Sequence, residues 1–536
     1  MILIALLAVL IPLFLLGILN MSARLGMTIS AIIVALTGYL FWKIPIDVLF
    51  ASILQGMHKT LPILWILFGA LMLLNVLRKT GAIDSINAGF KSLSLDMRIQ
   101  GILVAYLFGA LIEGVSGFGT PAMVTAPLLI ALGFTPLSAV VLALVANSTP
   151  AAFGAVGTPI TVGLSNAAQE QGNHIFSQVS STITSLDLLG GAFMPTILVL
   201  LMTLTLNKNK KSQRDWLEMI PWTLFIGVCY SGFAWLYSRV IGYEFVSIIT
   251  PLTMLALTIV LLRFNFLLPK STNKNPWRKL EEKKQIVQPQ NLKLENLSLI
   301  KAWLPYGIVV LLLLISRTIP MVKTFLNNTI NLSWDSILGF KEINSEWAIL
   351  YSPGLILTIA SLIALVVQVK SLKLFTPIAK DVFSTIMRTG LTLVVTLIMV
   401  QIFSNSGMNN GNHLSMPSYI AEILSRYLSG VWIFIAPFIG ELGSFITGST
   451  TVSNLTFASI QADIAYDSGL PIHAVLAGQV IGAAAGNMIC VFNIVAVSGV
   501  VGLFGKEGEI LRKTIIPALL YASLIAISTS LYLFFK

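Results

Sequence analysis

Two nearly uncharged segments contain the residues of this chain that are best suited to chemistry. The first is Gly109-Ala-Leu-Ile-Glu113-Gly-Val-Ser-Gly-Phe-Gly-Thr-Pro121, and the second is Pro437-Phe-Ile-Gly-Glu441-Leu-Gly-Ser-Phe-Ile-Thr-Gly-Ser-Thr450. In each, one glutamate ends a short apolar run and precedes a tip rich in Gly, Ser and Thr. Because an apolar environment favours the neutral form of a carboxyl group, such a glutamate is a natural proton carrier. We therefore expect Glu113 and Glu441 to take up and release protons.

The polar groups around the two tips suit a small carboxylate. Residues 114–169 include no charged side chain, yet five prolines interrupt them, and one straight helix cannot carry so many. Helices that end inside a membrane leave backbone N–H groups and a positive dipole end, which bind anions. Hydroxyl and amide groups nearby add further donors. The predicted substrate-binding residues are Ser116, Gly117, Gly119, Thr120, Asn147, Ser148, Thr149, Ser449, Thr450, Asn454, Asn487 and Asn493.

Neither segment contains Lys or Arg, so helix dipoles or an accompanying ion must balance the charge of a bound anion. A proton taken up with a monocarboxylate makes the pair neutral. Two other interpretations stay open, since small residues also allow close helix packing and a neutral glutamate can hydrogen-bond between helices. Asp187, Asp463 and Asp467 are weaker candidates, because they lie near the ends of predicted spans.

Other kinds of chemistry are not indicated. Cys229 and Cys490 lie far apart in the sequence, and the four histidines have no metal-ligand spacing, so neither a metal nor a cofactor is expected. We find no nucleophile–base pair that would indicate an intramembrane enzyme. We also find no ATP-hydrolysing domain, so any transport would be driven by gradients.

The elements that position these residues are predicted to be membrane-spanning helices. Of the 536 residues, 56% are hydrophobic and 10% are charged, and the mean hydropathy is +0.88. Repeated apolar runs are long enough to cross a bilayer as helices. We predict an all-α polytopic membrane protein with about 12 transmembrane helices plus two re-entrant hairpins. The predicted spans are 2–20, 26–41, 60–77, 136–164, 185–206, 216–238, 244–268, 302–320, 351–367, 388–407, 470–500 and 515–534.

Positive charge is distributed unevenly over the loops between these spans. If the N-terminus lies outside, one side of the membrane receives 24 of the 33 Lys and Arg residues. Cytoplasmic loops are the ones enriched in Lys and Arg, so this side is predicted to be the cytoplasm. The net charge of +11 thus indicates orientation in a membrane and no nucleic-acid partner.

The two halves of the chain are predicted to form an inverted repeat. Residues 1–268 contain a hairpin at about 113–135 and a broken helix at 136–164, and 302–536 contain a hairpin at about 441–463 and a broken helix at 470–500. An amphipathic segment precedes each hairpin, at 83–93 and 419–428. Residues 269–301 are a polar, cytoplasmic linker. A gap-free alignment of the broken helices pairs Pro136 with Pro471 and Asn147 with Gly482.

Four short stretches of the chain resemble motifs of the bacterial lactate permease family. They are Ser116-Gly-Phe-Gly-Thr-Pro121, Ala146-Asn-Ser-Thr-Pro-Ala-Ala-Phe-Gly154, Gly486-Asn-Met-Ile-Cys490 and Val501-Gly-Leu-Phe-Gly-Lys-Glu507. The resemblance covers nearly the whole chain. It implies uptake of L-lactate, glycolate and related 2-hydroxy monocarboxylates by proton symport across the bacterial cytoplasmic (inner) membrane. It also implies kinship with the ion transporter superfamily, and with it a homodimer. The expected partners are therefore a small carboxylate, protons and the lipid bilayer.

The sequence leaves one functional alternative and one departure from the family pattern. Sodium-coupled transport of another small organic anion stays open, since Asn, Ser and free carbonyl groups also suit Na⁺. The departure is Phe492, an apolar residue beside Asn493 where many members of the family carry a polar one. The preferred 2-hydroxy acid is therefore left undecided.

Overall fold

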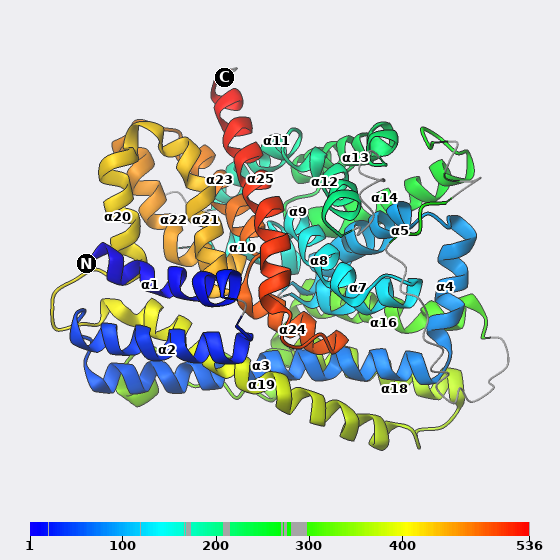
Figure 1. The fold of residues 1–536 in the computed structure, drawn as a ribbon, viewed down its shortest axis with the longest axis horizontal. Helices are drawn as coiled ribbons and strands as arrows, with labels where there is room; N and C mark the ends of the chain where they lie inside the picture. The colour runs from blue at the N-terminus through cyan, green and yellow to red at the C-terminus, as the bar shows by residue number, and fades with distance from the viewer. Residues whose placement is uncertain are drawn as a thin grey trace.

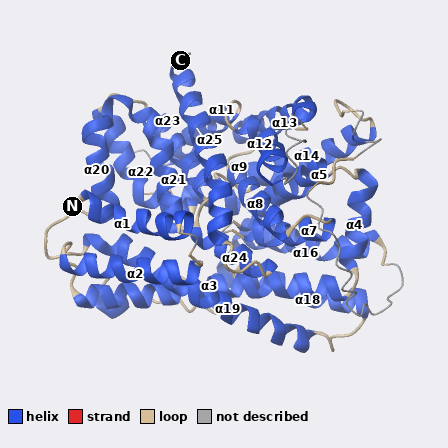
Figure 2. Cartoon of the chain, in the orientation of Figure 1, coloured by secondary structure: helices blue, strands red, loops and turns tan. Residues whose placement is uncertain are grey.

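The computed structural model describes residues 1–19, 21–117, 119–165, 167, 173–206, 215–269, 272, 276–279 and 297–534. Within these residues the regular structure is helical, apart from two isolated β-bridges, Asn331–Ala348 and Trp334–Ser345 (Figures 1 and 2). Ten of the described helices are long and apolar enough to cross a membrane, or up to 11 if one bent pair counts as a span. The prediction of an all-α polytopic membrane protein is confirmed.

The first helices form one layer of the molecule. They are α1 (Ile2–Pro12), η1 (Leu13–Ile18), α2 (Ala23–Leu40) and α3 (Ile46–Lys79). The predicted span 60–77 is too short, because α3 has 34 residues. Lys59 therefore lies inside a helix, where its Nζ donates to Gln401 Oε1 at 3.0 Å. The polar residues that interrupted the apolar run find partners there, as when Gln55 Nε2 donates to the Asn344 carbonyl at 2.7 Å.

The first hairpin begins earlier than predicted. After the amphipathic α4 (Ala82–Leu93), the continuous limb Met97–Ser116 comprises α5 (Met97–Gly101), η2 (Ile102–Phe108) and α6 (Gly109–Ser116). Gly117 and Gly119 belong to a tip that leads to α7 (Thr120–Leu132). Glu113 thus lies one turn before the tip, whereas the sequence placed it at the start of the hairpin. Gly117 and Gly119 have φ values of 62° and 73°, which glycine adopts without strain.

A broken helix and a bent one follow the first hairpin. The broken helix consists of α8 (Pro136–Ala146), α9 (Ser148–Ala151) and α10 (Gly154–Thr161), so the predicted interruption is present. The bent pair joins α11 (Asn173–Asp187) to η3 (Gly191–Phe193), α12 (Met194–Leu200) and η4 (Leu201–Leu206), with an angle of 45°. Asp187 therefore lies at the bend. The sequence analysis had placed it near the end of a span, which the structure corrects.

The next helices come from the middle of the chain. They are η6 (Leu217–Met219), α13 (Ile220–Val240), α14 (Val246–Arg263), α16 (Leu299–Thr318), α17 (Pro320–Thr329), η7 (Ile337–Gly339), α18 (Pro353–Val369), α19 (Phe375–Ser404) and η8 (Asn405–Gly407). Both α18 and α19 pack along α3, as Figure 1 shows in its lower part. The helix α19 begins earlier than the predicted span 388–407.

The second hairpin repeats the order of the first. After α20 (Met416–Leu428) and η9 (Ser429–Val431) come α21 (Trp432–Thr447), a tip at Gly448 and α22 (Thr450–Asp467). Then follow α23 (Ile472–Gly486), a break, α24 (Val491–Val501) and the last helix, α25 (Glu507–Phe534). This hairpin too begins before its predicted start, since Glu441 lies well inside α21.

The structure corrects the register of the proposed repeat. Asn147 and Asn487 occupy the same position, immediately after the helix that precedes each break. Pro136 lies 11 residues before Asn147, whereas Pro471 lies 16 residues before Asn487. The gap-free pairing of Asn147 with Gly482 was therefore wrong, because α23 is longer than α8. The inversion of the two copies stays a prediction.

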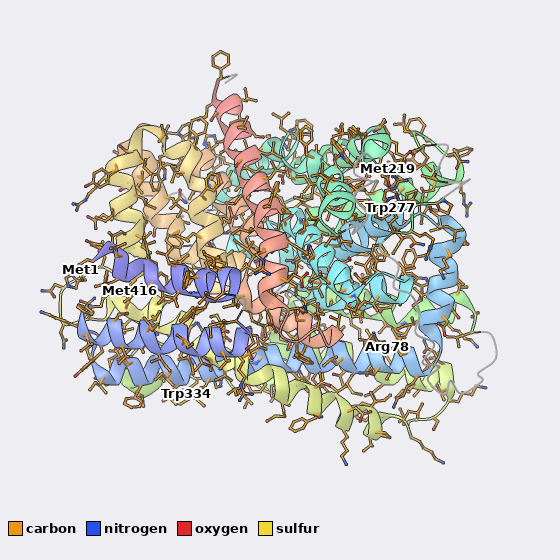
Figure 3. The ribbon with its side chains drawn as sticks, viewed as in Figure 1. Met1, Arg78, Met219, Trp277, Trp334 and Met416 are labelled. Atoms are coloured by element: carbon orange, nitrogen blue, oxygen red, sulfur yellow. The ribbon has the colours of Figure 1, made fainter. Side chains whose placement is uncertain are left out.

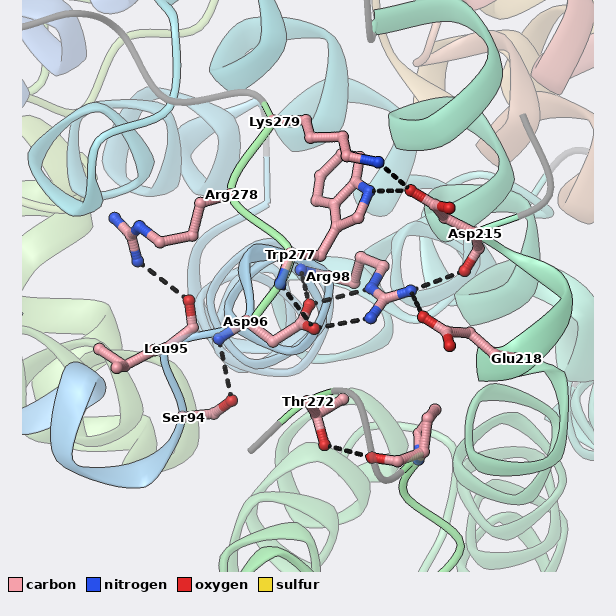
Figure 4. A network of polar contacts seen from close by, with 11 residues as sticks. Ser94, Leu95, Asp96, Arg98, Asp215, Glu218, Thr272, Trp277, Arg278 and Lys279 are labelled. Carbon is pink, nitrogen blue, oxygen red and sulfur yellow. Dashed lines mark hydrogen bonds and ion pairs between the residues drawn. The ribbon is translucent and has the colours of Figure 1, made fainter. Parts of the chain in front are cut away.

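Segments predicted to lie on opposite sides of the membrane gather at opposite ends of the molecule. Arg78, Met219 and Trp277 lie toward one end, and Met1, Trp334 and Met416 lie toward the other (Figure 3). At the first end, the Arg98 guanidinium bonds bidentately to Asp96, at 3.0 and 2.7 Å, and to Glu218 Oε1 at 2.6 Å (Figure 4). Most of the predicted linker 269–301 lies outside the described residues.

The four linker residues 276–279 contribute to this same network (Figure 4). Trp277 Nε1 and Lys279 Nζ both donate to Asp215 Oδ2, at 2.6 and 2.5 Å. The Trp277 backbone N–H donates to Asp96 Oδ2 at 3.2 Å. The linker is thus attached to the base of the first hairpin, since Asp96 caps α5.

Candidate functional site

A small cavity lies where the two hairpin tips meet. Its lining comes from the first tip, the second tip and both broken helices, and consists of Glu113, Gly117, Gly119, Ala151, Gly154, Ala155, Pro159, Gly448, Ser449, Thr450, Thr451 and Asn487. The cavity measures about 20 Å³, which is room for about one water molecule. Segments more than 300 residues apart in the sequence therefore form one site.

Glu113 supplies the charge-bearing group of this cavity. Its side chain is 3% exposed, and Asn147 on the neighbouring break hydrogen-bonds to it. Its Oε2 has no hydrogen-bond partner among the described residues. The carboxyl group lies against Gly154, where a Cβ would be only 2.3 Å from Oε1. Glu113 is thus held against the broken helix with one oxygen available to a ligand.

The second tip faces Glu113 with hydroxyl and amide groups. Ser449 caps α22 by accepting a bond from the Val452 N–H at 3.4 Å. Asn487 Nδ2 donates to Thr450 Oγ1 at 2.9 Å, while Asn487 Oδ1 is buried and has no partner in the part of the chain that the structure describes. This side of the cavity therefore offers a hydroxyl-rich helix N-terminus, a favourable place for an anion.

A chain of amides joins the second hairpin to the first broken helix. Asn454 Nδ2 donates to the Pro159 carbonyl at 3.0 Å. Behind it, Gln479 Nε2 donates to Asn454 Oδ1 at 3.3 Å, and Gln461 Nε2 donates to Gln479 Oε1. All three side chains are fully buried. Asn454 therefore lies behind the lining and joins the two halves of the site.

The predicted binding residues divide into two groups. Five of them line the cavity together with the predicted proton carrier Glu113, and these are Gly117, Gly119, Ser449, Thr450 and Asn487. The other predicted binding residues are not part of the lining and are Ser116, Thr120, Asn147, Ser148, Thr149, Asn454 and Asn493. Of the second group, the Ser116 hydroxyl donates to the Ile112 carbonyl of its own helix, and the Ser148 hydroxyl donates to the Val145 carbonyl of the preceding helix α8.

Asn493 and Phe492 sit beside the two tips. A Cβ at Gly119 would lie 2.6 Å from Asn493 Oδ1, and a Cβ at Gly448 would lie 3.0 Å from Phe492 Cδ1. Asn493 therefore packs on the first tip, and Phe492 packs on the second. The residue that departs from the family pattern thus lies against the tip glycine Gly448.

Glu441 does not line the cavity. It lies in α21, 3% exposed, seven residues before the tip glycine Gly448, whereas Glu113 lies four residues before Gly117. Neither of its carboxyl oxygens has a hydrogen-bond partner among the residues described. The two glutamates are therefore not at equivalent depths, and a proton-coupling role for Glu441 stays a prediction.

Comparison with known proteins agrees with this geometry. A family model described as L-lactate permease matches residues 1–535. The chain belongs to the L-lactate permease family. The predicted resemblance is thereby confirmed. The prediction that the protein is a multi-pass integral protein of the bacterial cytoplasmic membrane is confirmed as well.

Similar members of the family come from several bacteria. The L-lactate permease of Escherichia coli strain K12 is 28% identical over 516 residues, covering 92% of this chain and 88% of its own length. That of Bacillus subtilis strain 168 is 27% identical over 527 residues, with the same two shares. The glycolate permease of Escherichia coli strain K12 is 27% identical over 551 residues, covering 96% of this chain and 92% of its own length.

Half of the cavity lining of this permease lies outside the predicted substrate-binding and proton-coupling residues. These lining residues are Ala151, Gly154, Ala155, Pro159, Gly448 and Thr451. Apart from Thr451 they have no polar side-chain atom, so a search for donors and carboxyls passes over them. Ala155 has a φ of 45° and belongs to a left-handed run with Val156 and Gly157. Their only signal was position, since each adjoins a predicted tip or helix break.

Proposed function

We propose that this permease takes up L-lactate and related 2-hydroxy monocarboxylates, such as glycolate, together with protons. The names of its relatives support the substrate class, since they are L-lactate and glycolate permeases. The chemistry of the cavity supports the coupling. We propose transport without any enzymatic step, driven by the proton gradient.

One observation carries the proposal of proton coupling. Glu113 is the only ionisable side chain in the cavity lining, and the lining contains no Lys or Arg among the residues described. A carboxylate ligand near an ionised Glu113 would meet a like charge. At about 4 Å, with an effective dielectric constant of about 20, this repulsion amounts to about 4 kcal/mol. The substrate anion therefore requires a neutral Glu113.

This repulsion gives a reason for coupled movement. When Glu113 is protonated, its carboxyl group can donate to a substrate oxygen, and the bound pair is neutral. When the substrate leaves, its negative charge no longer favours the neutral form of Glu113, so Glu113 releases the proton as well. Each species thus lowers the cost of binding the other, which is the thermodynamic condition for symport.

The size of the cavity requires the tips to move during transport. Room for about one water cannot hold an acid with several heavy atoms, so the tips must separate to admit it. Gly117, Gly119 and Gly448 adopt left-handed or otherwise glycine-specific backbone conformations at these tips. Hinges of this kind absorb the change in backbone angles that such an opening needs.

Sodium-coupled transport of another small organic anion is the second candidate. Broken helices can bind Na⁺ through free carbonyl groups, and residues of both broken helices line this cavity. A cation bound there would pair with an ionised Glu113 instead of protonating it. The two candidates therefore differ in the state of Glu113 and in the ion that drives uptake.

Uptake of labelled L-lactate into proteoliposomes tests the proposal. We expect accumulation when an inward proton gradient is imposed, with or without Na⁺, and competition by unlabelled glycolate. Glu113→Gln should abolish accumulation while the protein still inserts and folds, because the amide cannot carry the proton. Glu441→Gln, assayed in parallel, measures whether the second buried glutamate contributes to the coupling.

A control variant and two outcomes make the test decisive. Glu422→Gln changes an acid that forms an exposed pair with Arg426 and should transport normally. Accumulation that depends on Na⁺ and ignores the proton gradient would establish the second candidate. Normal accumulation by Glu113→Gln would leave Glu113 a structural residue and remove the basis of the proposed coupling.

A further inference from the structure

A further buried acid, besides Glu113 and Glu441, lies at the bend between α11 and η3. Asp187 ends α11, is 4% exposed and forms no ion pair among the described residues. Its Oδ1 accepts a hydrogen bond from the Tyr521 hydroxyl of α25 at 2.8 Å. An unpaired charge at this depth is costly, so a carboxyl group there marks a site where a proton is bound.

Two hydroxyl groups, those of Tyr521 and Tyr106, face this acid from different elements, with Thr149 beside them. Thr149, in the short helix α9, neighbours the hydroxyls of both Tyr521 and Tyr106. Both Thr149 Oγ1 and the Tyr106 hydroxyl are buried, without a hydrogen-bond partner among the residues that the structure describes. The Tyr106 ring also packs on Tyr230, with centroids 5.0 Å apart. The cluster therefore has more polar groups than satisfied bonds.

Among the described residues, the titratable groups on the surrounding elements form no ion pair with Asp187. Tyr521 faces Asp187 from α25, Tyr106 from η2 and Tyr230 from α13. His473 is the only titratable residue of α23, and α10 has none. The Arg239 guanidinium is on the exposed flank, where it donates to the Ser181 carbonyl and Ser185 Oγ at 3.0 and 2.9 Å.

We infer that Asp187 is a second protonation site, whose proton decides whether the Tyr521 hydroxyl bonds to Asp187 or to Thr149. An ionised Asp187 can only accept, so it holds the Tyr521 hydrogen. A protonated Asp187 can donate to the Tyr521 oxygen, which frees the Tyr521 hydrogen for Thr149 Oγ1. The proton taken up stays on Asp187, and no other covalent bond is made or broken. Only the hydrogen-bond partners of the Tyr521 hydroxyl change.

This switch acts on the element that forms the cavity wall. Thr149 lies between Asn147, which bonds to Glu113, and Ala151, which lines the cavity. Ser148, the residue before it, contacts Met194 of α12 across the bend, with Oγ and Sδ 3.8 Å apart. A change in the partner of Thr149 thus shifts the break that positions Glu113. The inference rests on the proposed proton coupling and adds a second carboxyl group to it.

Two transport modes separate the role of Asp187 from a structural one. Exchange of labelled for unlabelled lactate across the membrane needs no net proton movement, whereas accumulation does. We expect Asp187→Asn to retain exchange and to lose accumulation driven by a proton gradient. Tyr521→Phe, which keeps the ring, should retain exchange and displace the pH profile of accumulation. Glu422→Gln alters the exposed acid that pairs with Arg426 and should match the unaltered protein.

The outcomes distinguish this inference from the proposed function. If the unaltered permease ignores the proton gradient, the proposed function fails. If it responds and Asp187→Asn accumulates lactate with an unchanged pH profile, the inference alone is overturned. Should Asp187→Asn not fold, Tyr521→Phe decides, because an unchanged pH profile in that variant overturns the switch. A dependence of either variant's defect on Na⁺ would also overturn it.

Discussion

The carboxyl group of Glu113 lies against the α-carbon of Gly154, where a Cβ would come within 2.3 Å of Oε1. The two residues belong to different helices, α6 and α10, and Gly154 begins the last piece of the broken helix. The absence of a side chain at Gly154 therefore decides where the Glu113 carboxyl group sits.

Gly154→Ala should impair transport more than folding. The displaced atom is the end of a flexible side chain, so the strain is relieved by moving the carboxyl group out of the cavity. A misplacement that costs about 1–3 kcal/mol lowers the rate of uptake about 5-fold to 150-fold. Uptake and thermal unfolding of the purified protein measure the two effects separately. Gly307→Ala, at an α16 position with nothing near the new Cβ, should change neither.

Asn487 provides a test of anion binding at the second tip. Asn487→Asp keeps the shape, and Thr450 can donate to the new carboxylate, but a negative charge then faces the substrate. We expect the KM for lactate to rise by about one to two orders of magnitude, as like charges in a partly buried site cost a few kcal/mol. Asn487→Ala should raise KM less, since it removes a polar group without adding a charge. Equal KM values for the two variants would place the anion elsewhere.

The general plan of this site could be predicted from the sequence because its signals are local. Continuous apolar runs, clustered prolines and glycines, and isolated acids each mark a helix, a break or a buried carboxyl without knowledge of the fold. The contacts between halves could not be predicted in this way. That Asn454 bonds to the Pro159 carbonyl depends on how the second hairpin meets the first broken helix across about 300 residues of chain. The position of Asp187 at a bend could not be predicted either, because no proline at that residue marks the bend in the sequence.

The network around Arg98 should stabilise the base of the first hairpin. Arg98 and Asp96 are 1% and 0% exposed, and removing one partner of a buried pair costs about 3–5 kcal/mol. Asp96→Ala should therefore lower the thermal unfolding temperature markedly. Glu422→Ala breaks the exposed Arg426 pair, worth less than about 1 kcal/mol, and serves as the control. A similar small shift of the unfolding temperature in both variants would mean that water replaces the hydrogen bonds that Arg98 loses with Asp96.

Phe492 should influence which 2-hydroxy acid is preferred, although it does not line the cavity. Its ring packs against the tip glycine Gly448, so a smaller residue leaves a space into which the second tip can move. Phe492→Ser should therefore enlarge the site and weaken the contact that distinguishes the methyl group of lactate from the hydrogen of glycolate. One methyl group in an apolar contact is worth about 1 kcal/mol, so we expect the ratio of lactate to glycolate uptake to fall about fivefold. Phe492→Leu, which fills most of the space, should stay near the original ratio. An unchanged ratio in Phe492→Ser would show that the second tip does not contact the substrate methyl group.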